Sequence, residues 1–398
     1  MNSARHLLVY HVPLGEADGT SVMLRRLYKP CAERLLHLTF RRGRQAPPAE
    51  FRRIHVASEL PWPFARGARF VRRIFPKIAM PALAASSPQL HRVRNVWRRS
   101  PAPALVCVYS DDHAARARVL LRHAGVDRYV LMLMDLLDEG PVTPDALPEL
   151  FALARDASAL ITVSAQLGDE LARHVSAPQL VLQPPCGFVP GFPPDRHLGP
   201  FRALATGALY AGRDSFFETV FLPGWLAFVA RRPAAELLYI GTEAHKLSPA
   251  ARRHVRELGR RPAAEFSRLL ASASVGVLPV RHEAASRWRF SVPGRLADYL
   301  AAGLPIVAPT CPGTATEDFL AGLPAGVAHF ASTATEVERA LLRLHDERAE
   351  RRMIAETAVA FAREHLELPK TRARFFDWLR RHTAPAAETA ALPSVAWP

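Results

Sequence analysis

An arginine and an aspartate lie on one face of a short helix that the sequence predicts between Gly294 and Gly303. The helix falls in the segment RFSVPGRLADYLAAGLPIVAP, residues 289–309, and an apolar strand follows it. Arg295 and Asp298 are three residues apart, so their side chains are neighbours on the helix surface. A helix N-terminus and Arg295 together suit a diphosphate, and Asp298 could accept hydrogen bonds from ribose hydroxyls. The segment predicts a nucleotide-sugar site; the alternative is an ordinary helix–strand unit with a surface ion pair.

Loops that follow three expected strands in the same half of the chain supply further candidates. The candidates are Arg213, Gly241 and Arg281. Ligands of parallel α/β sheets bind at the carboxyl ends of the strands, so these residues could contact the same anionic ligand. Arg213 would face a phosphate, Gly241 would permit close approach of the backbone, and Arg281 lies in a long cationic loop. The alternatives are solvated surface arginines and a glycine without a ligand role.

Two aspartates in the first half of the chain are candidates for catalysis. Asp135 ends the apolar run VLMLM, where a carboxylate is unfavourable unless it is exposed at the sheet edge or used. Facing an acceptor hydroxyl, Asp135 could act as a general base; the alternative is the start of a polar loop. Asp18 precedes the first expected helix, where a helix cap is the stronger interpretation and a catalytic role the alternative.

No spacing in the sequence predicts a metal centre. Asp111, Asp112 and His113 follow the run LVCVY and are secondary candidates, but no further ligand spacing supports a metal site there. The sequence also offers no D-x-D run of the type that binds a metal–nucleotide-sugar complex. The four cysteines are far apart and form no C-x-x-C pair, which excludes a disulfide scaffold and fits a reducing cytoplasm.

The elements that must position these residues alternate between apolar strands and amphipathic helices in both halves of the chain. This alternation predicts parallel sheets covered on both faces. Residues 184–200 separate the halves and hold six prolines and three glycines, which is a linker composition. At 398 residues, two doubly wound α/β domains joined by a hinge are expected, with a cleft where the two halves face each other.

Positive charge is concentrated in one segment. Residues 41–100 contain 14 Arg and Lys against two Glu, a balance of +12 out of the net +15 of the chain. Residues 64–75 within it form an amphipathic helical pattern with aromatic residues opposite arginines, as in helices that lie in a membrane interface. The predicted membrane-facing residues are Trp62, Phe64, Arg66, Arg69, Val71, Arg72, Arg73 and Phe75. The alternative is a core-packing helix with a solvated basic face; nucleic acid is less expected, because no known binding motif is present.

The N-terminus has no long apolar core of the kind that signal peptides carry. No apolar stretch reaches the ~18–20 residues that span a bilayer. We therefore expect a cytoplasmic protein that is soluble or peripheral to the inner face of the plasma membrane.

The motif PGRLADYLAAGLPIV, together with ITVSAQL at 161–167 and CGF at 186–188, resembles the GT-B glycosyltransferases. It looks most like the family-4-like enzymes of bacterial polysaccharide assembly. The resemblance implies that Arg295 replaces the phosphate-binding lysine, Asp298 the ribose-binding glutamate, and that Arg213 faces the diphosphate. Retaining members carry another glutamate eight residues earlier, where this chain has Phe290. The layout is also similar to the inverting, peripheral-membrane glucuronosyltransferase of xanthan assembly, which implies Asp135 as the base.

These observations predict a hexosyl- or glycuronosyltransferase that needs neither metal nor cofactor. It would move a sugar from a UDP-linked donor to a lipid-linked or polysaccharide acceptor, with the donor bound by Arg213, Gly241, Arg281, Gly294, Arg295 and Asp298. The alternatives are a nucleotide-sugar 2-epimerase of the same fold and a non-catalytic basic protein that binds nucleic acid or anionic glycans. The predicted parts are an acceptor domain at 1–190, a donor domain at 191–366, a helix at 367–382 that returns to the first domain, and a disordered tail at 383–398.

Overall fold

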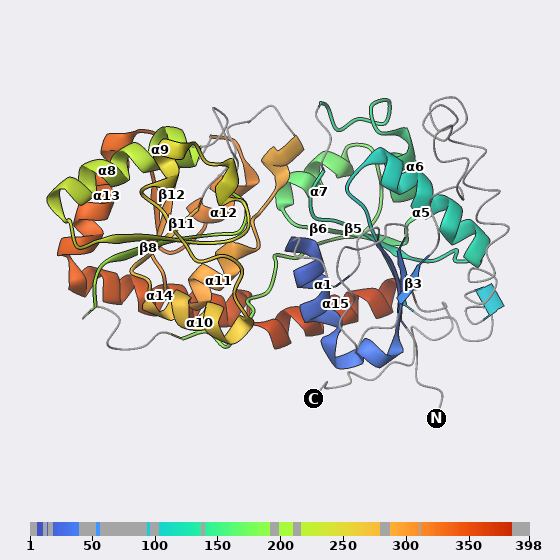
Figure 1. Cartoon of the computed structure of the whole chain (residues 1–398). Helices are drawn as coiled ribbons and strands as arrows, with labels where there is room; N and C mark the ends of the chain where they lie inside the picture. Colours follow the sequence, from blue (N-terminus) through green and yellow to red (C-terminus); the bar gives the residue numbers. More distant parts are fainter. Residues whose placement is uncertain are drawn as a thin grey trace, which may run out of the picture. The chain divides into compact units, whose positions relative to one another are not determined.

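The computed structural model divides the chain into two compact units. Unit 1 comprises Met1–Leu182 and Arg372–Pro398, and unit 2 comprises Gln183–Thr371. Figure 1 traces the chain through both units. The structure describes residues 6–10, 14, 19–39, 53–55, 94–95, 103–136, 140–191, 199–209, 216–278, 287–309 and 312–383.

Unit 1 contains a parallel sheet of seven strands in the order β3-β2-β1-β4-β5-β6-β7. The strands are β1 (His6–Tyr10), β2 (Leu35–Thr39), β3 (Arg53–His55), β4 (Ala104–Cys107), β5 (Val130–Leu133), β6 (Ala159–Thr162) and β7 (Gln179–Val181). Register pairs such as Val9 with Val106 place the buried runs side by side. The strands at the centre of the sheet are buried on both faces, which is why they read as continuous apolar runs.

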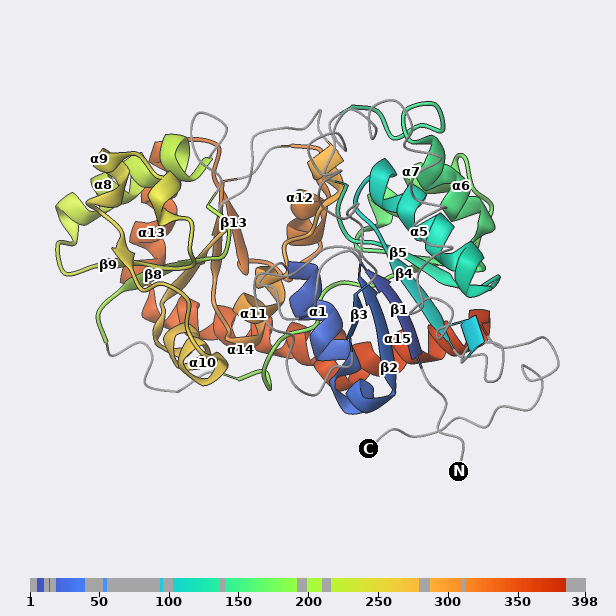
Figure 2. The same ribbon diagram turned by 45° about the vertical axis from the view of Figure 1, so that its right-hand side comes forward.

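Helices cover both faces of this sheet, with α1 and α15 on one side and α5, α6 and α7 on the other (Figure 2). Their bounds are α1 (Gly19–Tyr28), continued by a 3-10 helix (Lys29–Arg34), α5 (Asp111–Ala124), α6 (Pro148–Asp156), α7 (Ala165–Ala172) and α15 (Leu368–Thr383). The side chains of Ser110 and Ser164 accept hydrogen bonds at the N-termini of α5 and α7. Gly125, at φ 71°, ends α5 in the left-handed conformation that favours glycine.

Unit 2 contains a parallel sheet of six strands in the order β10-β9-β8-β11-β12-β13. The strands are β8 (Arg202–Thr206), β9 (Glu236–Ile240), β10 (Arg256–Glu257), β11 (Val275–Val277), β12 (Ile306–Ala308) and β13 (Ala328–Phe330). The order turns back at β8, because β9 lies on one side of it and β11 on the other. Ligands of open α/β sheets bind at such a reversal, outside the carboxyl ends of the strands.

In unit 2, α8, α9 and α13 lie on one side of the sheet, and α10, α11 and α14 on the other (Figure 2). The helices are α8 (Leu222–Arg231), preceded by a π-helical turn (Phe217–Phe221), α9 (Pro249–Arg252), α10 (Ala263–Ser272), α11 (Arg295–Ala301), α12 (Ala315–Ala321), α13 (Ala334–Asp346) and α14 (Arg348–His365), with 3-10 turns at Ala244–Lys246 and Arg287–Phe290. Thr333 and Glu336 form a capping box at the start of α13, which fixes where that helix begins.

The last helix, α15, packs within unit 1. Phe376 lies 5.1 Å from His6 and Phe375 lies 5.5 Å from Tyr28, measured between ring centroids. Arg372 donates hydrogen bonds to the backbone carbonyls of Leu27 and Arg26, at the end of α1. Unit 1 is therefore assembled from the two ends of the chain.

Several predictions concern residues outside those that the structure describes. These are the amphipathic helix at 64–75 with all of its membrane-facing residues, from Trp62 and Phe64 to Phe75, and the tail from residue 384 onward. No helix among the described residues is long and apolar enough to cross a membrane.

Candidate functional site

The helix that carries Arg295 and Asp298 is α11, which is closely packed in unit 2. Gly294 is its N-cap, and all residues from Leu296 to Ala301 are buried. Beyond its C-terminus, Gly303 has a φ of 65°, and a Cβ there would lie only 2.9 Å from the carbonyl oxygen of Ala355 in α14. Close packing against α14 therefore fixes α11 beside the carboxyl ends of the strands.

Arg295 binds the backbone at the end of β8. Its Nη1 donates to the carbonyl oxygens of Thr206 and Ala208, the latter at 2.8 Å. Among the described residues, its Nε and Nη2 have no hydrogen-bond partner, and the side chain is half-buried. Guanidinium groups bind phosphate oxygens through two parallel N–H groups, so this second edge suits a diphosphate while Nη1 keeps its carbonyls.

Asp298 is 6% exposed and holds the segment with which unit 2 begins. Its Oδ1 accepts a hydrogen bond of 2.7 Å from the backbone N–H of Gly187. Gly187 lies in the proline-rich segment that the sequence predicts as a linker. The carboxylate of Asp298 thus sits between α11 and that segment, and its several lone pairs allow it to accept more than one hydrogen bond.

The loops after β8 and β9 are joined by side chains. Tyr239 donates to the carbonyl oxygen of Gly207 at 2.6 Å and accepts from the N–H of Glu243 at 3.1 Å. The Oε2 of Glu243 accepts from the N–H of Leu209 at 3.3 Å. Burial raises the pKa of Tyr239, so its hydroxyl stays protonated and able to donate at neutral pH.

Gly241 follows β9 as predicted, but the structure gives it a packing role. A Cβ on Gly241 would lie 2.0 Å from the hydroxyl oxygen of Tyr239 and 2.8 Å from the carbonyl oxygen of Gly207. The glycine is therefore needed to make room for Tyr239, whatever else approaches it.

A second tyrosine, Tyr299, ties α11 to the sheet beneath it. Its hydroxyl lies 3.0 Å from the carbonyl oxygen of Val277 and 3.2 Å from the hydroxyl of Thr206. Gly276 in β11 leaves space for the ring, since a Cβ there would lie 2.7 Å from it. Phe290, at the position of the glutamate in retaining enzymes, is buried at 4% exposure and offers no acid–base group.

In unit 1, Asp135 lies two residues beyond β5, at the carboxyl edge of the sheet, and is half-buried. At the same edge, Tyr10 ends β1 and Tyr109 follows β4, the strand next to β5, and their hydroxyls lie 2.7 Å apart. Asp135 thus lies at the edge of the sheet where ligands of parallel α/β sheets bind.

The secondary candidates beside it have structural roles. The Oδ1 of Asp111 accepts hydrogen bonds from the backbone N–H groups of Glu149 and Leu150, at 2.8 and 2.9 Å, and so caps α6. Asp112 forms an exposed ion pair with Arg116. In the part of the chain that the structure describes, no three His, Cys, Asp or Glu side chains form a group that could hold a metal ion.

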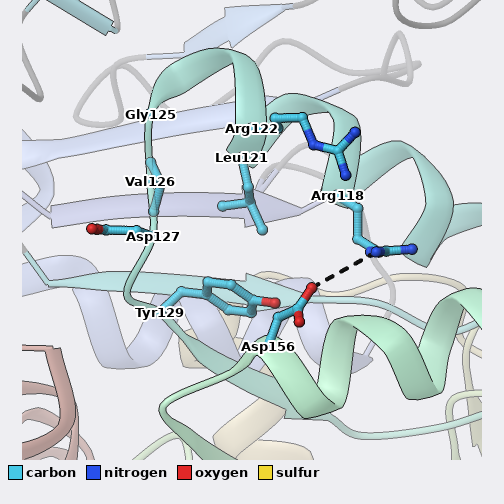
Figure 3. A pocket seen from close by; sticks show the side chains of 8 residues that line it. All are labelled: Arg118, Leu121, Arg122, Gly125, Val126, Asp127, Tyr129 and Asp156. Atoms are coloured by element: carbon cyan, nitrogen blue, oxygen red, sulfur yellow. Dashed lines mark ion pairs between the residues drawn. The ribbon is translucent and has the colours of Figure 1, made fainter.

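A cavity of about 510 Å³ lies at the opposite, amino-terminal edge of the same sheet (Figure 3). Its lining residues are Arg118, Leu121, Arg122, Gly125, Val126, Asp127, Tyr129 and Asp156. Of its lining residues, Arg118 and Asp156 lie 3.8 Å apart (Figure 3), and Arg118 also pairs at 2.6 Å with Glu149, outside the lining. The cavity contains none of the predicted site residues.

The structure brings Gly241, Gly294, Arg295 and Asp298 together in unit 2 and places Asp135 in unit 1. Asp18, Arg213 and Arg281 lie outside the described residues. The sequence interpretation gave no role to Tyr239, Glu243 or Gly187, which form hydrogen bonds around the site. The signal for Tyr239 was present in YIG: a glycine two residues after a tyrosine at a strand end.

The region around this site matches a known family. Residues 202–346 match a family model described as glycosyl transferases group 1. The matched region contains β8 to α13, and with them Tyr239, Arg295 and Asp298. Comparison with curated protein sequences gives no significant match.

The whole chain is similar to solved GT-B structures. HepE of Anabaena, crystallised with UDP and glucose, is 14% identical with a TM-score of 0.64, over 95% of this chain and 99% of its own. A sucrose-phosphate synthase from Thermosynechococcus elongatus is 14% identical with a TM-score of 0.63, over 95% and 99%. WaaG, a glycosyltransferase involved in lipopolysaccharide biosynthesis, is 14% identical with a TM-score of 0.56, over 96% and 100%.

At these identities the likeness establishes the architecture. The chain has the GT-B fold with two Rossmann-like units, and the predicted fold class is confirmed. The finer resemblance to the glucuronosyltransferase of xanthan assembly stays a prediction.

Proposed function

We propose that this protein is a glycosyltransferase that moves a sugar from a nucleotide-diphosphate donor, UDP-linked, to a lipid-linked or polysaccharide acceptor. The observation that carries the proposal is that the glycosyltransferase family match at 202–346 contains Arg295 and Asp298 on one short helix beside the strand ends. UDP is the nucleotide proposed because HepE, a structure of the same fold, was crystallised with UDP and with UDP-glucose.

In this proposal unit 2 binds the donor. The Nε–Nη2 edge of Arg295 binds the diphosphate, and the carboxylate of Asp298 accepts from the ribose hydroxyls. Arg213, Arg281 and the backbone at Gly241 and Gly294 complete the donor contacts. The arginines and the N-terminus of α11 supply the positive charge that stabilises the leaving diphosphate, so the proposed reaction proceeds without a bound metal or cofactor.

Unit 1 binds the acceptor, and Asp135 is the proposed base; Asp18 is a second candidate in the same unit. As the acceptor oxygen attacks C1 of the sugar, Asp135 takes the proton of the acceptor hydroxyl. The bond from C1 to the diphosphate breaks, and UDP leaves with the electron pair. Attack from the opposite face would invert the configuration, which agrees with the buried Phe290 at the position of the retaining glutamate.

Donor binding is tested by thermal unfolding in the presence of UDP, GDP, ADP and their sugar conjugates. A ligand at one hundred times its dissociation constant stabilises the fold by about 2.7 kcal/mol, so UDP and one UDP-sugar should raise the unfolding temperature. Stabilisation by none of these nucleotides would contradict the proposal. Release of an epimerised nucleotide sugar in the absence of any acceptor would show that the protein is a 2-epimerase instead.

The role of Asp135 is tested by Asp135→Asn, which keeps the size of the side chain and removes the base. We expect the transfer rate to fall at least about 100-fold, while UDP affinity stays unchanged because the donor binds to the other unit. Asp112→Asn is the matched control, since it removes an exposed carboxylate near the neighbouring strand end. Transfer by Asp135→Asn at the wild-type rate would exclude Asp135 as the base.

We also propose that the basic segment at 41–100 rests on the cytoplasmic membrane face, where the acceptor would be anchored. Its charge of +12 supports this, because each basic residue near an anionic bilayer contributes about 1 kcal/mol. Flotation with vesicles that contain phosphatidylserine, compared with retention of DNA at the same salt concentration, tests it. Retention of DNA without flotation would exclude the membrane role.

A further inference from the structure

The buried hydroxyl of Tyr239 joins two loops of unit 2, those that follow β8 and β9. Tyr239 is in β9, and no part of its side chain is exposed. Its oxygen donates to the carbonyl of Gly207 at 2.6 Å, after β8, and accepts from the N–H of Glu243 at 3.1 Å, after β9. This hydroxyl therefore bonds to both loops, which the hydrogen bond from Leu209 to Glu243 also connects.

The loop after β8 begins with a turn, residues 206–209, in which each residue forms a hydrogen bond with a side chain. Gly207 is exposed and has a φ of 77°, a left-handed conformation that favours glycine. The carbonyls on either side of it, those of Thr206 and Ala208, accept from Nη1 of Arg295. The N–H of Leu209 donates to Glu243. Three side chains thus hold the turn 206–209 in one conformation before any ligand arrives.

Arg295 depends on this turn for its own position. Its guanidinium carbon lies 3.4 Å from the place where a Cβ of Gly207 would stand, so the group lies directly against the turn. Loss of the Tyr239 hydroxyl would leave the carbonyl of Gly207 unpaired and allow the turn to rearrange. The two carbonyls that anchor Arg295 would then move with it.

We propose that Tyr239 is a positioning residue for the donor diphosphate: its hydroxyl fixes the turn 206–209 and, through that turn, the guanidinium of Arg295. The inference rests on the proposed function, because it assumes that Arg295 binds the diphosphate. A preformed turn spares the ligand the cost of ordering the loop, so the effect of Tyr239 lies in affinity for the nucleoside diphosphate. Gly241 is needed for this arrangement, because only a glycine there leaves room for the hydroxyl of Tyr239.

The variant Tyr239→Phe tests the proposal, since it removes one oxygen and keeps the ring in the core. The matched control is Tyr129→Phe in unit 1, which removes a similar hydrogen bond, from the hydroxyl to the carbonyl of Leu153 at 2.7 Å. Affinity for UDP is measured by calorimetry, and the unfolding temperature is measured without ligand. We expect Tyr239→Phe to weaken UDP binding about tenfold and Tyr129→Phe to leave it unchanged, although both lose similar stability.

Gly241→Ala provides a second variant that displaces the hydroxyl without changing Tyr239, and it should weaken UDP binding at least as much. Binding of UDP by Tyr239→Phe within twofold of wild type would overturn the inference. Equal weakening by Tyr239→Phe and Tyr129→Phe would also overturn it, because the effect would then follow from stability alone. If the wild type itself binds none of UDP, GDP and ADP, the proposed function fails and this inference with it.

Discussion

At the scale of single residues, Arg295 combines a structural role with the role in donor binding that we propose. Its Nη1 donates to two backbone carbonyls, and its Nε and Nη2 have no hydrogen-bond partner among the described residues. A guanidinium has five N–H donors in a fixed plane, so both sets of bonds can form at once. A lysine has one ammonium group and cannot reproduce both edges.

We therefore predict that Arg295→Lys weakens UDP binding by about 10- to 100-fold, even though the charge is kept. Isothermal calorimetry measures this directly. Arg343→Lys is the control, because the side chain of Arg343 pairs with Glu350 between α13 and α14, and its replacement should not change UDP affinity. An Arg295→Lys variant that binds UDP as tightly as the wild type would show that charge alone suffices at this position.

At the scale of elements, α6 shows why some helices are hard to find in the sequence. The alternation of strands and helices predicts both sheets, but no capping side chain in the local sequence marks the start of α6. The N-cap of α6, Leu147, has no capping side chain, and the cap comes from Asp111, which is distant in sequence. Asp111 reaches the start of α6 only in the folded protein, so no local sequence pattern can predict this cap.

The same reason limits what the sequence predicts of the site. Arg295 and Asp298 could be identified because their spacing places both on one helix. Their partners are the backbone groups of Thr206, Ala208 and Gly187, which every residue carries and no pattern marks. No pattern marks β10 either, because its two residues are charged and exposed and show no apolar run.

The capping role of Asp111 gives a prediction about stability. Asp111→Ala leaves two backbone N–H groups of α6 without their acceptor, so it should lower the free energy of unfolding by about 1–2 kcal/mol. Asp112→Ala should lower it by less than about 0.5 kcal/mol, because it removes only an exposed ion pair. Urea denaturation of both variants makes the comparison. Equal losses would mean that the charge at the start of α5, which both residues share, matters more than the cap.

At the scale of the whole molecule, His6 makes unit 1 sensitive to acid. The ring is buried between Tyr28 of α1 and Phe376 of α15, and its Nδ1 has no hydrogen-bond partner within the described residues. Burial, together with the charge of Arg34, lowers the pKa of His6 to about 4, against 6.5 for an exposed histidine. The unfolded chain therefore binds a proton at a pH where the folded chain does not.

The contribution of His6 to stability is full above pH 6.5 and is lost as the pH falls toward 4. Between pH 7 and pH 5 the wild type should lose about 2 kcal/mol more unfolding free energy than His6→Gln, which cannot titrate. Urea denaturation of the two proteins at both pH values measures this difference. If both lose the same amount, the pH dependence comes from other groups.

The packing of α15 in unit 1 also has a consequence for biosynthesis. The ribosome makes the strands of unit 1 first and α15 last, with all of unit 2 in between. Until Phe375 and Phe376 leave the ribosome, the rings of His6 and Tyr28 lack the aromatic cover they have in the finished protein. A nascent chain that stalls within unit 2 would expose this apolar surface to chaperones and proteases. For the same reason, a fragment for expression of unit 1 alone needs residues 372–383 joined to it.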